Sequence, residues 1–173
     1  LAISATEPKD GKFTFYIDAV TLDGVVDQGG FSIKNVDIEA FKNALIKAAA
    51  KHDEWKSVAI ENNVADLTKE VKLDKKIKAS GYFLYGSEWH FQFGIRPYIK
   101  FLVIESENKP ISYWTVIYTG ELQSSKNQYI DCENFMIKFD SAEEILAFEK
   151  LINPSSVEKF FNSKKNEVDL FKD

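Results

Sequence analysis

Two histidines, His52 and His90, are the only imidazoles of the chain and the first candidates for acid–base chemistry near neutral pH. His52 stands in the run His-Asp-Glu-Trp, which lacks the spacing of a helical zinc motif, and it falls in an apolar stripe. We therefore expect a packed histidine there. His90 shares one face of a predicted strand with Gln92, so it is the better candidate for lining a site.

Cys132 is the only cysteine, and its neighbours Asp131 and Glu133 disfavour a reactive thiolate. Asp18, Asp23 and Asp27 lack the order of an oxygen-ligand calcium loop. The chain also has no nucleophile elbow, no phosphate-binding loop, no dinucleotide fingerprint and no paired-cysteine zinc pattern. We predict no cofactor and no metal.

Aromatic residues are the most unusual feature of the composition, with 14 Phe, 7 Tyr and 3 Trp. Many of them lie in residues 82–118, where they form either a thick core or a binding surface. Trp114 and Tyr118 share one face of a predicted strand. Arg96 is the only arginine, and its guanidinium is predicted to hold a carboxylate of a ligand or of the protein itself. The candidate binding residues are Trp89, His90, Gln92, Arg96, Trp114 and Tyr118.

The charge balance makes a nucleic-acid partner unexpected. The 173 residues contain 22 basic and 27 acidic side chains, which gives a net charge of −5. Binding to phosphate backbones needs clustered cations, and no such cluster occurs. The longest apolar run, residues 101–104, is far too short for a transmembrane segment.

The first five residues resemble the end of a signal peptide that is cleaved after Ala5, with small side chains before a polar stretch. This pattern predicts a periplasmic or secreted protein, and a cytoplasmic protein is the alternative. Asn153 is followed by Pro154, so it is no glycosylation acceptor, which suits a bacterial exported protein better than a eukaryotic one.

The pattern of apolar residues predicts strands at both ends of a first helix. Residues 12–20 alternate as a half-buried strand, and residues 31–33 are expected to pair with it. Asp37 is positioned to cap a helix whose apolar residues recur at three and four, with an end at or before Asn62-Asn63 and a kink or break near residues 51–54.

The region from residue 70 to residue 139 predicts an antiparallel meander of about six to seven strands. The expected strands are residues 71–77, 79–85, 89–96, 98–105, 111–119 and 129–139, separated by short turns. In the strand 89–96, Trp89, Phe91, Phe93 and Ile95 are predicted to face the core, and His90, Gln92, Gly94 and Arg96 to form the polar face.

Two helices are expected after the meander. The residues Ser141-Ala142-Glu143-Glu144 read as a capping box for a helix that ends before Pro154. Ser155 or Ser156 is expected to cap a second, short helix, and residues 163–173 are expected to fray, with Leu170 and Phe171 as anchors.

These elements predict one α+β domain over residues 1–173, with a flexible segment at residues 1–10. The order of elements resembles helix-grip folds, and a cystatin-like or nuclear-transport-factor-like sheet with helices on one face is the alternative.

The function expected from the sequence is binding without catalysis. The absent catalytic motifs and the aromatic strands favour a bacterial envelope or secreted domain that binds an apolar small molecule or a protein partner. One alternative is a small hydrolase that uses His90 with an unidentified carboxylate. Another is an acidic inhibitor or immunity-type protein that masks a basic partner.

Overall fold

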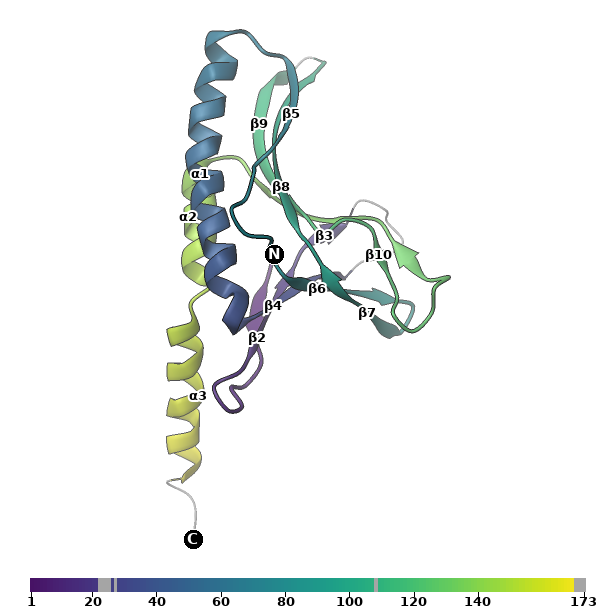
Figure 1. The fold of residues 1–173 in the computed structure, drawn as a ribbon, viewed down its shortest axis with the longest axis vertical. Helices are drawn as coiled ribbons and strands as arrows, with labels where there is room; N and C mark the ends of the chain where they lie inside the picture. The colour runs from purple at the N-terminus through teal and green to yellow at the C-terminus, as the bar shows by residue number, and fades with distance from the viewer. Residues whose placement is uncertain (22–25, 27, 108, 170–173) are drawn as a thin grey trace.

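The alternating apolar residues of the N-terminal region build one five-stranded antiparallel sheet, which we call the first sheet (Figure 1). The computed structural model describes residues 1–21, 26, 28–107 and 109–169. The strand order is β1-β2-β4-β6-β7. The strands are β1 (Ile3–Ala5), β2 (Thr14–Asp18), β4 (Gly29–Lys34), β6 (Ala79–Tyr85) and β7 (Glu88–Ile95). The predicted pairing of residues 31–33 with the first strand is confirmed, since Phe31 lies opposite Ile17 and Ile33 opposite Phe15.

A second five-stranded antiparallel sheet, the second sheet, has the order β3-β12-β9-β8-β5. Its strands are β3 (Val20–Thr21), β5 (Asp66–Glu70), β8 (Tyr98–Ser106), β9 (Lys109–Tyr118) and β12 (Phe135–Phe139). A small hairpin of β10 (Leu122–Gln123) and β11 (Asp131–Cys132) stands beside β7.

The fold is α+β as predicted, but the single meander is wrong. The turn at Arg96-Pro97 sends β7 into the first sheet and β8 into the second. Residues 71–77 form no strand, although Val71 and Ile77 are buried, because the apolar side chains pack on the core while Asp74 and Lys75 bend the chain. The predicted strand 129–139 is divided into β11 and β12.

One uninterrupted helix, α1 (Ile38–Glu61), covers a face of the second sheet and reaches the first. A short 3-10 turn, Asn35–Asp37, precedes it, and Asp37 occupies the N-cap position without a side-chain capping hydrogen bond, contrary to the prediction. The predicted stop is confirmed: the Asn62 side chain donates to the carbonyl of Val58, and Asn63 takes a positive φ of 51°. The helix runs through residues 51–54 without a break.

The C-terminal region forms two helices, α2 (Ala142–Leu151) and α3 (Pro154–Asp169), with a bend between them. Ser141 accepts from the backbone N–H of Glu144 as predicted, while the Glu144 carboxylate accepts from Asp140. The cap of α3 is Asn153, whose side chain accepts from the N–H of Ser155, so the prediction of Ser155 or Ser156 is wrong. Figure 1 shows α2 beside α1 and α3 extending beyond the sheets. Leu170 and Phe171 lie outside the described residues.

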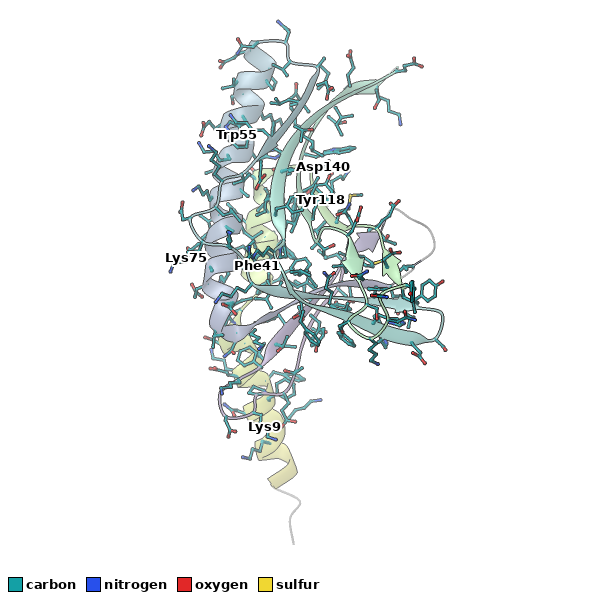
Figure 2. The ribbon with its side chains drawn as sticks, turned by 45° about the vertical axis from the view of Figure 1, so that its right-hand side comes forward. Lys9, Phe41, Trp55, Lys75, Tyr118 and Asp140 are labelled. Carbon is teal, nitrogen blue, oxygen red and sulfur yellow. The ribbon has the colours of Figure 1, made fainter. Side chains whose placement is uncertain are left out.

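The core lies between α1, α2 and the two sheets. Phe41 of α1 contacts Phe31 of the first sheet and Phe148 of α2, with ring centroids 5.7 and 6.4 Å apart. Trp55 lies further along the same helix (Figure 2). Its ring contacts Phe101 of the second sheet, with ring centroids 5.9 Å apart. The helix therefore binds both sheets into one structure. Among the described helices, none is long and apolar enough to cross a bilayer.

Candidate functional site

The exposed face of the first sheet carries a group of aromatic side chains, Tyr16, Tyr82, Trp89, Phe91 and Phe93, which we call the aromatic face. The register places these residues on one side because cross-strand partners share a face. Tyr82 opposes Phe91, and its ring lies 5.4 Å from Tyr16 and 5.9 Å from Trp89. Phe93 is 72% exposed and Trp89 is 42% exposed, so two large apolar groups of this face meet solvent.

A glycine bulge explains why Phe93 and Ile95 lie on opposite faces of the sheet. Ala79 pairs with Ile95 and Ser80 pairs with Phe93, so Gly94 is the extra residue, at a φ of 74° that suits glycine. After the bulge, Ile95 turns inward and is buried. The prediction that Trp89, Phe91 and Phe93 face the core is therefore wrong, and only Ile95 of the four residues is buried.

The aromatic face is hollowed into a groove of about 530 Å³. Its apolar wall is formed by Tyr16, Phe91 and Phe93. The hydroxyl-bearing residues that line it are Thr14, Ser32 and Ser80, and its charged residues are Lys34, Lys78 and Asp37. A groove of this size with a few polar groups is the usual shape of a site for a small organic molecule.

Tyr82 holds the centre of the aromatic face in place. Its hydroxyl donates to the Asp18 carboxylate at 2.7 Å, and only 4% of the residue is exposed. Burial, followed by this hydrogen bond and the negative charge of Asp18, raises the pKa of Tyr82 far above its usual value. The phenol therefore stays protonated and acts as a fixed donor.

The two predicted residues His90 and Gln92 lie on the opposite face of β7 and do not meet solvent as a polar surface. His90 is 4% exposed, its ring stacks on Phe83, and its Nδ1 atom lies 2.9 Å from the Ser124 hydroxyl. The Gln92 side-chain oxygen accepts from the backbone N–H of Gln123 at 2.8 Å. Both residues therefore attach the segment that contains β10 to the first sheet.

The His90–Ser124 contact has one feature of a hydrolytic dyad and lacks the others. The Ser124 hydroxyl oxygen also accepts from the N–H groups of Lys126 and Asn127, each at 3.2 Å. Because these two donors occupy the lone pairs of its oxygen, the Ser124 hydroxyl is left to point its own proton toward the Nδ1 atom of His90. No carboxylate within the described part of the chain hydrogen-bonds to His90, and Ser124 is itself only 5% exposed.

Trp114 and Tyr118 lie on the outer face of the second sheet, turned away from α1, as Figure 2 shows for Tyr118. Tyr118 stacks on Tyr98 with ring centroids 5.4 Å apart, and the Lys100 ammonium lies 5.6 Å from the Tyr118 ring. Lys138 lies 4.4 Å above Trp114. Partial burial raises the pKa of Tyr98 and Tyr118. The rings of this face are already covered by cations on one side.

Arg96 lies between β7 and β8, is exposed, and makes no ion pair or hydrogen bond within the described residues. The six predicted residues are therefore not brought together. Trp89 belongs to the aromatic face, and the others are divided among the interior, a turn and the second sheet.

Comparisons with protein families, with curated proteins and with solved structures find no match to this chain. No functional site of a known relative can therefore be transferred to this chain. Within the described ranges, no three His, Cys, Asp or Glu side chains gather as a metal site requires. Asp23 and Asp27 of the rejected calcium loop lie outside the described residues. The groove on the aromatic face is the candidate site that its own geometry supports.

Five residues that line the groove were not predicted from the sequence as site residues: Tyr16, Phe91, Phe93, Lys34 and Lys78. Tyr16 was visible on the polar side of the first strand, where an aromatic group is unexpected. A glycine inside a strand also marks a bulge, and Gly94 is the signal that Phe93 and Ile95 lie on opposite faces.

Proposed function

We propose that the protein is a non-enzymatic binding domain that holds the apolar part of a small organic ligand in the groove on the aromatic face. The observation that carries the proposal is the exposure of Phe93 and Trp89 beside a hollow of about 530 Å³. Large aromatic groups that face solvent lose favourable burial, and a contiguous exposed apolar patch marks a site of interaction. A ligand that covers Phe93 recovers this burial.

The test is the binding of a neutral apolar dye, Nile red, followed by its fluorescence. We expect Phe93→Ser to weaken binding about tenfold or more, because full burial of a phenylalanine contributes about 1.5–3 kcal/mol. The matched control is Phe160→Ser on α3, because Phe160 is 52% exposed and lines a separate groove of about 460 Å³. Equal binding by the wild type and Phe93→Ser, or loss of binding in Phe160→Ser alone, would contradict the proposal.

A protein partner is the other expectation from the sequence, and the same face could supply its surface. The concave shape favours a small molecule over a flat protein contact. If no small apolar probe binds, and a bound protein instead shields Phe93 from solvent, the protein partner is the correct alternative.

The hydrolase alternative needs an accessible acid–base pair, and His90 is buried against Ser124 with no carboxylate hydrogen-bonded to it among the residues that the structure describes. No observation favours the acidic-inhibitor alternative beyond the net charge of −5. The resemblance to helix-grip folds is one of element order and supports no part of this proposal. Export to the periplasm or the exterior stays a prediction; residues Ile3–Ala5 form β1, so a cleavage after Ala5 would remove an edge strand of the first sheet.

A further inference from the structure

The charge of the groove is opposite to that of the molecule. Its charged lining consists of Lys34, Lys78 and Asp37, two cations and one anion, although the whole chain carries a net charge of −5. Local charge decides which ligand a concave site attracts, because low-dielectric walls focus the field of the groups that line it. The groove therefore favours a negative ligand group.

Lys34 is the last residue of β4, and Lys78 directly precedes β6; both line the groove. Ser32 of β4 is opposite Ser80 of β6, and the two strands are antiparallel. The pairing ends at these two serines, and both lysines follow just beyond it, at the same end of the two strands. Two positive charges at one end of a groove repel each other, and an anion between them relieves that repulsion.

Neither lysine has a protein partner for its charge in the described part of the chain. Four other lysines, Lys42, Lys47, Lys51 and Lys138, form ion pairs with carboxylates. Lys34 and Lys78 form none within 4.0 Å and are exposed, although Asp37 lines the same groove. Their ammonium groups are free to bind a carboxylate, sulfonate or phosphate as charge-assisted donors.

We propose that the ligand is an amphipathic organic anion, whose apolar body lies on Phe91 and Phe93 and whose negative group lies between Lys34 and Lys78. This inference rests on the proposed function and adds the chemical class of the ligand. The size of the groove limits the apolar body to that of a typical small organic molecule.

The experiment compares two fluorescent probes on the full chain, anilinonaphthalene sulfonate, which is negative, and Nile red, which is neutral. In the double variant Lys34→Gln/Lys78→Gln we expect the affinity for the sulfonate to fall about tenfold or more, and the affinity for Nile red to change less than about twofold. Added salt should weaken sulfonate binding to the wild type and leave Nile red binding nearly constant. Lys150→Gln on α2 is the control for a change in total charge, because Lys150 is exposed and remote in sequence from the groove strands.

The outcomes separate the two proposals. Loss of both probes in Phe93→Ser with unchanged sulfonate binding in the double lysine variant overturns the anionic class and leaves the proposed function intact. Probes that bind equally well to Phe93→Ser overturn the proposed function. Equal weakening by Lys150→Gln shows a general charge effect and also overturns the assignment of Lys34 and Lys78. The melting temperature of each variant identifies loss of folding, and the single variants Lys34→Gln and Lys78→Gln replace the double variant if it does not fold.

Discussion

His52 is a residue of α1 that faces the second sheet, and its imidazole has one hydrogen-bond partner in the described part of the chain. Its Nδ1 atom is 3.0 Å from the Thr115 hydroxyl, its Nε2 atom has none, and only 1% of the residue is exposed. Burial lowers the pKa of His52 below 6.5, and Lys56 lowers it further, while Asp53, Glu143 and Asp140 oppose the shift. The folded protein therefore favours the neutral ring.

We predict that the free energy of unfolding falls as the pH drops below 6.5, the ordinary value from which the pKa of His52 is lowered. Above that pH both the folded and the unfolded chain hold a neutral His52, so its contribution is complete. Below it the unfolded chain takes up a proton that the folded chain resists, until the pH passes the lowered pKa of the folded state. Urea unfolding at about pH 7.5 and about pH 5.5 measures the effect. His52→Leu should reduce the difference between the two pH values, and an unchanged difference would assign it to other groups.

The Ser124 hydroxyl takes part in three hydrogen bonds. One joins it to His90 of β7, and two join it to the backbone of its own turn. We predict that Ser124→Ala lowers the stability by about 1–3 kcal/mol, because the buried His90 ring and the part-buried N–H groups of Lys126 and Asn127 lose their partner. Thermal unfolding measures this loss. In the same experiment a panel of ester substrates should show no turnover by either protein. Turnover by the wild type that disappears in Ser124→Ala would instead make Ser124 a nucleophile.

At the scale of the elements, the sheets meet where β12 of the second sheet passes β4 of the first. Gly29 makes this contact possible, because a Cβ atom at that position would overlap the Phe135 ring and the carbonyl oxygen of Tyr82. Phe135 is fully buried there. The absence of a side chain at Gly29 thus permits the close approach of two sheets.

We predict that Gly29→Ala destabilises the protein by about 1–3 kcal/mol or more, because a rigid backbone oxygen and a buried ring both resist the added methyl group. Gly86→Ala is the matched control: it takes a positive φ of 62° in a turn with open space around it, so only backbone strain opposes the change. Urea unfolding of the two variants compares them. A smaller loss for Gly29→Ala than for Gly86→Ala would refute the role of the Gly29 contact.

Helices and hairpin strands were predictable because their signals are local. The three and four spacing of Ile38, Phe41 and Leu45 identified the buried face of α1, and the break at Asn62-Asn63 identified its end. The division into two sheets was not predictable, since the short turn at Pro97 fits a continued meander as well as a change of sheet. The groove was missed for a related reason: a one-residue bulge places Ile95 and Phe93 on opposite faces, and alternation alone does not detect it.

At the scale of the whole molecule, one main core joins the elements. Its buried residues extend from Phe13 to Ile152 and include side chains of both sheets, α1 and α2. Neither sheet can bury its apolar face without α1, and the Lys42–Glu149 ion pair at 3.0 Å adds a link between α1 and α2. Such shared burial favours unfolding in a single step.

We predict one cooperative unfolding transition whose midpoint is the same by circular dichroism and by tryptophan fluorescence. We further predict that limited proteolysis cuts only within the first ten or the last ten residues, roughly the ends that composition marks as least anchored. Mass spectrometry of the digest identifies the cuts. Two resistant fragments of comparable size would contradict the single domain.

The pairing of β3 with β12 means that the second sheet cannot be completed until the end of the chain has been synthesised. Val20 lies opposite Met136 and Thr21 lies opposite Phe135. A strand near the start of the chain therefore pairs with a strand that is translated near the end. Contacts between such distant segments slow folding, because a large loop must close before they form. A nascent chain that stalls before residue 135 would leave β3 and β9 without their neighbour β12 and with apolar surface exposed. Newly made molecules therefore lose their tendency to aggregate only when the last quarter of the chain has been translated, and not already when the first sheet has formed.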